Sequence, residues 1–189
     1  MLTSKVSGII FDLDNTLVSS SLNFSEIRQA INCPKDKDIL EFVDSLPAVQ
    51  KDGVLKKILQ FEMLDAESAT ILAGTKKLLR YLDIAQIPCA IVTRNCKQAA
   101  LLKINNNNIN IPILITRENS KAKPAPDSVY FIADYWQQSP ENILFVGDHL
   151  YDIQTAKNAQ AMSCLINYGN SLSYEHLANL VIKDLTELI

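Results

Sequence analysis

The sequence predicts an α/β protein in which a doubly wound parallel sheet forms a Rossmann-like core and a small α-helical cap is inserted after the first strand. Three observations predict this class. Short apolar runs alternate with helix-forming segments through most of the chain, as in right-handed β–α–β crossovers. The block that follows the first apolar run has helical spacing only. Polar residues directly follow several apolar runs, at the strand ends where open parallel sheets bind ligands.

The composition fits one core domain with a small appendage, because 48% of the 189 residues are hydrophobic. A net charge of −3 predicts neither nucleic acid nor a membrane surface as partner. The first apolar run is interrupted by Asp12 and Asp14, so it predicts neither a signal peptide nor a membrane span. The four cysteines lack the pairwise spacing of a metal site, which favours reduced thiols in a cytoplasmic protein.

The first strand, residues 9–11, leads into two acids separated by one leucine, Asp12 and Asp14. Asn15 and Thr16 follow and favour a turn or a helix start, so the acids could simply cap a helix. Two carboxylates this close repel each other unless a cation neutralises them. The pair therefore also predicts a cation site at the carboxyl end of the strand.

We expect a core domain formed by residues 1–17 and 74–189 and a cap formed by residues 18–73. The polar run 19–21 is a candidate hinge between them. Apolar residues spaced by three and four predict three or four short helices in the cap, which is too small to be stable without the core.

The remaining elements follow in order, each predicted from an apolar run or a helical spacing. They are a helix around Leu78 and Leu82, a strand ending at Thr93, a helix over 97–103, a strand over 113–116, a helix over 127–138, a strand over 143–146, a helix over 151–160, a strand over 164–166, and a last pair over 180–182 and 185–189 that finishes one sheet edge.

Charged and polar residues also follow the later strands. Gly147 and Asp148 end one strand, and a further acid, Asp152, comes one helical turn later. Another strand ends at Thr93, which Arg94 and Asn95 follow. A proline-rich loop between them carries two lysines just before a helix, Lys121 and Lys123.

Four motifs in this order carry a resemblance: Asp12-Leu13-Asp14-Asn15-Thr16, then Thr93, then Lys123-Pro124-Ala125-Pro126, then Gly147-Asp148 with Asp152. With them the chain resembles the haloacid dehalogenase-like hydrolase superfamily, in its phosphatase branch with a small helical cap, similar to phosphoglycolate phosphatases. The resemblance covers the whole chain in outline, but the cap segment contributes no motif. Four ordered motifs are far more specific than a single pair of acids.

The chemistry of carboxylates assigns the first motif. Asp12 is the predicted nucleophile, which would form an aspartyl-phosphate, and Asp14 the predicted general acid and base. A phosphate dianion and several carboxylates repel one another unless a cation neutralises them. Mg²⁺ is the expected cation, because it prefers oxygen ligands. The predicted ligands are Asp12 and Asp148, and the resemblance implies that the backbone carbonyl of Asp14 is a further one.

Thr93 and Lys123 are the predicted phosphate-binding pair, as a hydroxyl donor and a fixed ammonium. Lys121 is a rival that the residues alone do not exclude; the resemblance favours the lysine that directly precedes Pro124. The other predicted phosphate ligands, Arg94 and Asn95, could equally lie on the surface.

Asp152 is expected to orient metal-bound waters or Lys123, with an ordinary helix-start acid as the alternative. His149 is interpreted as incidental. In the cap, three basic residues could bind a second anionic group or form a solvated helix face: Arg28, Lys35 and Lys37.

The predicted function is Mg²⁺-dependent hydrolysis of a small phosphomonoester, with a small phosphorylated metabolite as partner. A phosphomutase and a metal-independent dehalogenase remain alternatives. Asp14 and Asp148 count against the dehalogenase, and the intact nucleophile Asp12 counts against a non-enzymatic binding protein. The sequence leaves the substrate open, and both a monomer and a dimer are compatible with it.

Overall fold

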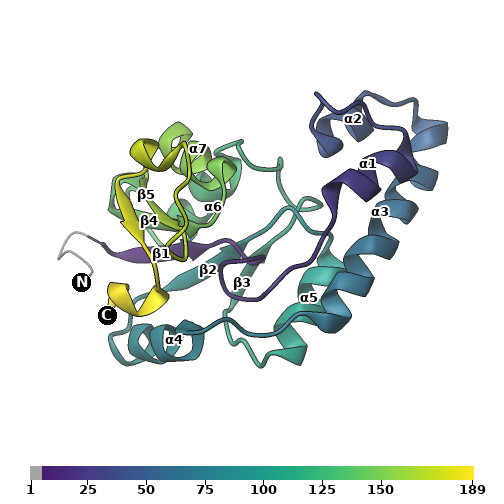
Figure 1. The fold of residues 1–189 in the computed structure, drawn as a ribbon. Helices are drawn as coiled ribbons and strands as arrows, with labels where there is room; N and C mark the ends of the chain where they lie inside the picture. The colour runs from purple at the N-terminus through teal and green to yellow at the C-terminus, as the bar shows by residue number, and fades with distance from the viewer. Residues whose placement is uncertain (1–5) are drawn as a thin grey trace.

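The computed structural model describes residues 6–189, which form one six-stranded, all-parallel sheet with helices on both faces (Figure 1). The strand order is β3-β2-β1-β4-β5-β6, which confirms the predicted fold class. The strands are β1 Gly8–Phe11, β2 Cys89–Val92, β3 Ile113–Ile115, β4 Ile143–Gly147, β5 Met162–Ile166 and β6 Leu180–Ile182. The helices are α1 Phe24–Ile31, α2 Ile39–Ser45, α3 Ala48–Ser68, α4 Thr75–Ile84, α5 Lys97–Asn106, α6 Asp127–Tyr135 and α7 Leu150–Asn158, with 3₁₀ turns η1 Pro140–Asn142, η2 Glu175–Leu177 and η3 Leu185–Leu188.

Strand β1 lies in the middle of the sheet and is buried on both faces. Ile9 and Phe11 point into one apolar core with α4 and α5, whereas Ile10 points into the opposite core with α6 and α7. This alternation follows from the two-residue period of a strand. Phe11 pairs with Ile91 of β2 and Val146 of β4, so the residues after all three strands emerge at the same level.

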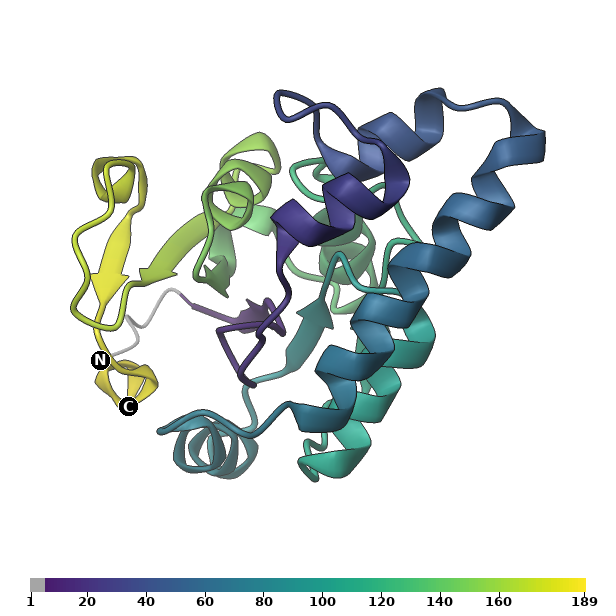
Figure 2. The ribbon, with the colours of Figure 1, turned by 45° about the vertical axis from the view of Figure 1, so that its right-hand side comes forward.

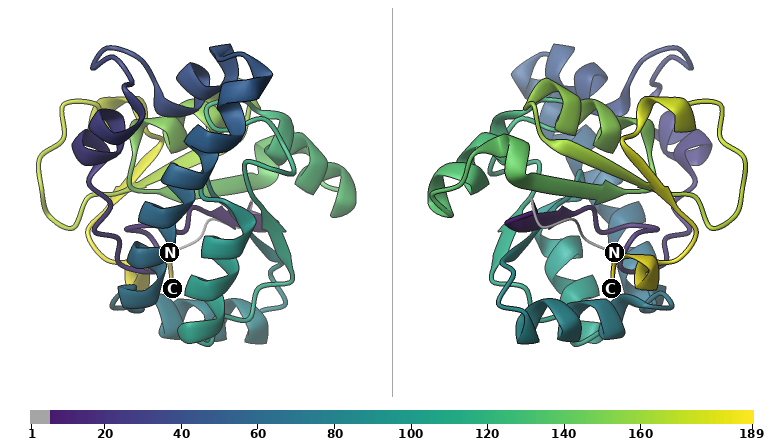
Figure 3. Two further views of the ribbon diagram at one scale, coloured as in Figure 1. Left: turned by 90° about the vertical axis from the view of Figure 1, so that its right-hand side faces the viewer. Right: turned by 90° about the vertical axis from the view of Figure 1, so that its left-hand side faces the viewer.

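The three helices after β1 pack together beyond the carboxyl ends of the central strands, at the upper right of Figure 1. Their shared apolar core includes Ile27, Ile39 and Ile58, one from each helix. The third helix, α3, is much longer than expected and runs back along α5, as Figures 2 and 3 show. There Ala66 of α3 packs against Ala99 of α5. The helical character of the segment is as predicted, and the domain boundaries stay a prediction.

The expectation of a final strand at 185–189 is wrong, because Leu185–Leu188 forms the 3₁₀ turn η3. Asp184 begins this turn: its side chain accepts a hydrogen bond from the backbone N–H of Thr186 at 2.7 Å. The two leucines are three residues apart and both pack into the core beside α4, a spacing that suits a turn of helix. Strand β6 is the sheet edge, as predicted.

Within residues 6–189, no helix combines the length and the apolar character that a membrane crossing requires.

Candidate active site

Residues that follow three neighbouring strands meet at one edge of the sheet. Asp12 follows β1, Thr93 follows β2 and Asp148 follows β4, and the strand register brings them to the same cavity. The cavity has a volume of about 370 Å³ and lies between this edge and the cap. The core residues that line it include Asp12, Asp14, Asn15, Thr93, Arg94, Lys123, Asp148, His149, Tyr151 and Asp152, and the residues from the cap segment are Ser20, Leu22, Phe24, Arg28, Asp38 and Ile39.

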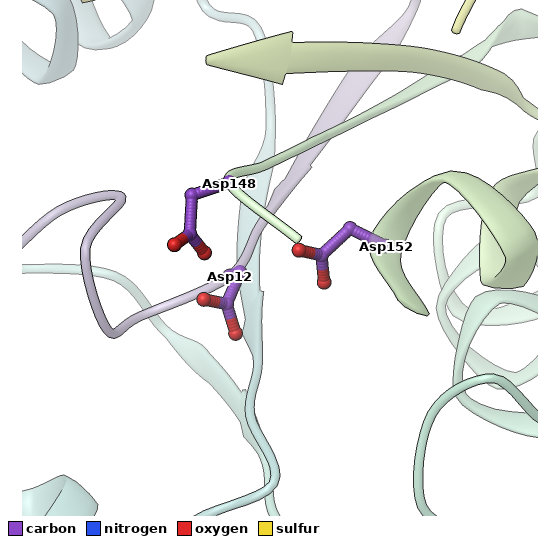
Figure 4. A group of neighbouring side chains, drawn as sticks. All are labelled: Asp12, Asp148 and Asp152. Carbon is purple, nitrogen blue, oxygen red and sulfur yellow. The ribbon is translucent and has the colours of Figure 1, made fainter. Parts of the chain in front are cut away.

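Three aspartates form an acidic cluster in this cavity: Asp12, Asp148 and Asp152 (Figure 4). Each offers a carboxylate oxygen, and these atoms lie within 4.8 Å of one another. Burial raises the pKa of Asp12 to about 6, although Lys123 opposes the shift. Burial also raises the pKa of Asp148 to about 8, and repulsion from Asp12 and Asp152 adds to it.

One buried ammonium, that of Lys123, contacts this cluster. Its Nζ binds Asp12 and lies 2.6 Å from Oδ1 of Asp152. Both carboxylates raise the pKa of Lys123 against the effect of burial, so the side chain stays charged. The one positive charge of Lys123 does not balance the three carboxylates, so the cluster stays negative. Its carboxylate oxygens are the kind of ligand that a hard divalent cation such as Mg²⁺ prefers. Lys121 is exposed and pairs with Asp127 at 3.5 Å.

Asp152 combines the two roles that the sequence left as alternatives. Its Oδ1 binds Lys123, and its Oδ2 accepts a hydrogen bond from the backbone N–H of His149 at 3.0 Å, at the start of α7. His149 is the N-cap of this helix: its Nδ1 accepts from the N–H of Tyr151 at 3.2 Å. Sequence reasoning missed this role, because histidine is not among the preferred N-cap residues.

Asp14 has a separate set of partners. One carboxylate oxygen contacts Nζ of Lys103, on α5, and the other contacts Nδ2 of Asn95. Burial raises the pKa of Asp14 to about 6, while Lys103 acts in the opposite direction. The side chain of Asp14 remains 21% exposed and faces the cavity. The carboxylate is thus held on one side and accessible on the other.

Asn95 is buried and connects Thr93 to Asp14; it does not line the cavity. Its Nδ2 and its backbone N–H both donate to Oγ1 of Thr93, at 3.0 and 3.1 Å. Since Oγ1 accepts both bonds, the Thr93 hydroxyl can donate its own hydrogen elsewhere.

Arg94 lines the cavity, but its guanidinium is engaged by the cap. Its Nη2 donates to both carboxylate oxygens of Asp38, at 2.7 and 2.6 Å, and its Nη1 donates to the carbonyl of Lys123. Tyr151 donates to the same carboxylate at 3.0 Å, and its ring lies 4.5 Å from the guanidinium carbon of Arg94. Despite its burial, the pKa of Asp38 is lowered by Arg94. This contact joins the start of α2 to the core.

Sequence reasoning missed three charged residues at or beside the site: Asp38, Asp65 and Lys103. In the sequence, Asp38 has the position of an ordinary helix N-cap. It does cap α2, because its Oδ1 accepts a hydrogen bond from the N–H of Leu40 at 2.9 Å. Lys103 lies four residues after Ala99 on the buried face of α5, and this spacing is the signal that could have found it.

Fold and site together define an α/β enzyme with an acidic crevice beneath a helical cap. The chain belongs to the haloacid dehalogenase-like hydrolase family, because residues 18–166 match the family model described as haloacid dehalogenase-like hydrolase. It is similar to a haloacid dehalogenase-like hydrolase domain-containing protein of Arabidopsis thaliana, with 26% identity over 87% of this chain and 72% of that protein. It is also similar to the N-acetylmuramic acid 6-phosphate phosphatase of Pseudomonas aeruginosa, with 22% identity over 87% of this chain and 83% of the enzyme.

A solved structure of a haloacid dehalogenase-like hydrolase from Bacteroides fragilis has the same fold. It superimposes with a TM-score of 0.79, and the match covers 97% of this chain and 100% of that one at 20% identity. The likeness therefore extends over the cap as well as the sheet.

Proposed function

We propose that this chain is a Mg²⁺-dependent phosphatase that hydrolyses a small phosphorylated metabolite through an aspartyl-phosphate at Asp12. One observation carries the proposal: a buried aspartate at the end of the central strand contacts a buried lysine inside a cavity, next to the two other carboxylates of the acidic cluster, Asp148 and Asp152. The similarity to a phosphatase of Pseudomonas aeruginosa supports the phosphomonoester as the class of substrate. The four unpaired cysteines suit the reducing cytoplasm.

In the first step an oxygen of Asp12 attacks phosphorus, and the bond between phosphorus and the leaving oxygen breaks. Asp14 gives its proton to that oxygen, so an alcohol leaves. In the second step Asp14 takes a proton from water, whose oxygen attacks the aspartyl-phosphate. Inorganic phosphate departs and the Asp12 carboxylate is restored.

The phosphoryl group is held by Lys123, as a point charge, and by the free hydrogen of the Thr93 hydroxyl. Asp12, Asp148 and the backbone carbonyl of Asp14 would hold Mg²⁺, while Asp152 keeps Lys123 in place. When bound, the ion neutralises charge on the carboxylates and the phosphate. The Nη2 of Arg94 donates to both carboxylate oxygens of Asp38, so we assign Arg94 first to the cap contact.

Replacing the nucleophile tests the proposal. Asp12→Asn should lower phosphate release from p-nitrophenyl phosphate by ~10³-fold or more. An amide does not attack phosphorus, so the aspartyl-phosphate cannot form. The measurement is steady-state phosphate release with and without Mg²⁺. Asp134→Asn is the matched control, since Asp134 is exposed on α6, and it should leave the rate unchanged.

Turnover by Asp12→Asn at the wild-type rate would remove Asp12 from its role. The products separate the alternatives: a phosphatase releases inorganic phosphate, whereas a phosphomutase returns a phosphorylated isomer. Dehalogenase activity would appear as halide release from a haloacid without added Mg²⁺.

A further inference from the structure

We infer that Lys103 is a positioning residue for Asp14, and that it ties this acid/base group to the connections of the cap through Asp65. The inference rests on the function proposed above, in which Asp14 exchanges protons with the leaving group and water. It adds to that function a lysine from outside the cavity.

The ammonium of Lys103 contacts two carboxylates. The side chain is 0% exposed, and its Nζ contacts Oδ1 of Asp14 and lies 2.6 Å from Oδ2 of Asp65. A buried ammonium is costly unless it is paired, so this lysine is stable only in the place where both carboxylates reach it. Each partner is thereby held to one position.

Asp65 carries the connection to the cap. It lies on α3, and its carboxylate accepts hydrogen bonds from the hydroxyl of Ser20 at 2.8 Å and from the N–H of Ser21 at 2.6 Å. Ser20 and Ser21 belong to the segment that leaves the core after β1, whereas α3 is the helix that returns to it. Both connections of the cap therefore meet at the carboxylate that Lys103 binds.

The other buried lysine of the site provides a useful contrast. Lys123 lies between Asp12 and Asp152 just as Lys103 lies between Asp14 and Asp65. Lys123 lines the cavity, so it can also bind phosphate. Lys103 does not line the cavity. Its influence on the reaction must therefore pass through Asp14.

Asp14 is held at both oxygens, by Lys103 and by Asn95, and keeps one accessible side toward the cavity. A carboxylate oxygen has lone pairs to spare after one such bond, so the bound group can still carry and transfer a proton. Without Lys103, the carboxylate would lose one of its two anchors. Proton transfer to the leaving oxygen would then suffer more than the attack by Asp12.

Leaving-group dependence tests this distinction. A series of substituted phenyl phosphates is hydrolysed by the wild type, Asp14→Asn and Lys103→Met, and kcat/KM is plotted against the basicity of the leaving group. p-Nitrophenolate departs with little help, whereas phenolate needs a proton. For Lys103→Met we expect a loss of ~100-fold on phenyl phosphate and less than ~10-fold on p-nitrophenyl phosphate, in the manner of Asp14→Asn.

Two further variants complete the experiment. Lys97→Met makes the same change at an exposed position of α5 and should match the wild type across the series. Lys103→Met/Asp65→Asn removes one charge of each sign, so it leaves one carboxylate, that of Asp14, without its ammonium, whereas Lys103→Met leaves two and is more prone to unfold. We expect the steeper leaving-group dependence in the double variant too, and it decides the matter if the single variant does not fold.

An equal loss on every substrate, or no loss, in the folded variants would reduce Lys103 to a structural ion pair and overturn the inference. If the wild type hydrolyses none of the phosphates, the proposed function fails and the inference fails with it. If the wild type and Asp14→Asn behave as expected while the Lys103 variants keep the wild-type slope, the inference alone fails.

Discussion

At Gly147, the last residue of β4, the missing side chain leaves room for Asp152. A Cβ at this position would lie 2.2 Å from the carboxyl carbon of Asp152. That carboxylate cannot move freely, because it binds Lys123 and caps α7. The glycine is therefore a steric requirement of the Lys123 site.

We predict that Gly147→Ala lowers kcat/KM by ~10- to 100-fold, because it displaces Asp152 and with it the ammonium beside the nucleophile. It should also destabilise the fold by ~1–3 kcal/mol through overpacking. Phosphatase assays and urea denaturation measure the two effects.

Gly53→Ala is the matched control. Apart from the adjacent residues and the backbone of its own helix, no heavy atom lies within 4 Å of the Cβ it would add. Gly53 is inside α3, so this variant should be more stable by up to ~1 kcal/mol and equally active. If Gly147→Ala behaved in the same way, the steric argument would be wrong.

Single residues differ in how well the sequence reveals them. Asp12 and Lys123 stand in motifs at strand ends, and the structure brings them together. Lys103 lies in a helix, and lysines in helices are usually exposed. Its burial depends on two carboxylates that are distant in sequence, Asp14 and Asp65. Contacts of this kind leave no local pattern. They require the packing of α3 on α5, which the sequence did not predict.

Among the elements, α3 shows where apolar periodicity fails. The part of α3 around Ile58 packs in the cap, and its C-terminal part, around Ala66, packs on α5. Between these, the buried face carries Glu62 and Asp65, so the apolar pattern stops before the helix does. The expected short helix was therefore only the part of α3 with a conventional apolar face.

Besides the pair of Asp65 with Lys103, a second buried ion pair holds the C-terminal part of α3: Arg117 binds Glu62. We predict that Glu62→Gln destabilises the protein by about 3 kcal/mol, because it leaves the guanidinium buried without its counter-charge. Urea denaturation provides the measurement. The control is Asp44→Asn, which removes an exposed pair with Lys51 at 3.9 Å and should cost less than ~0.5 kcal/mol. Equal costs for the two variants would show that the Glu62 pair does not anchor the helix.

At the scale of the whole molecule, the acidic site makes folding stability depend on pH and on metal. The pKa values of Asp12 and Asp14 rise to about 6 and that of Asp148 rises to about 8, all above the ordinary 3.8. The folded protein therefore binds protons more tightly at these groups than the unfolded chain does. Their contribution to stability is complete below about pH 4 and is lost as the pH rises through 6 and 8.

We predict that Tm in a chelating buffer falls by roughly 5–10 °C between pH 5 and pH 8, with the lowered pKa of His149 acting weakly in the opposite direction. Calorimetry measures Tm. Mg²⁺ should raise Tm more at pH 8 than at pH 5, because it binds the ionised carboxylates. Asp148→Asn should reduce both the fall and the response to Mg²⁺. A Tm that increases from pH 5 to pH 8 without metal would contradict the cited shifts.

The overall architecture was the most predictable level. Alternating strands and helices predicted the parallel sheet, and the polar residues after β1, β2 and β4 predicted which of its edges holds the site. The position of the cap was not predictable, because it depends on contacts such as Arg94 with Asp38 that join segments far apart in the chain.

The central place of β1 also has a consequence during protein synthesis. This strand leaves the ribosome well before its two neighbours, which begin only at Cys89 and Ile143. Until β4 emerges, an apolar strand that carries the nucleophile has an unpaired edge, which is open to association with other nascent chains. We expect aggregation during translation to be greatest for chains that stall before residue 143.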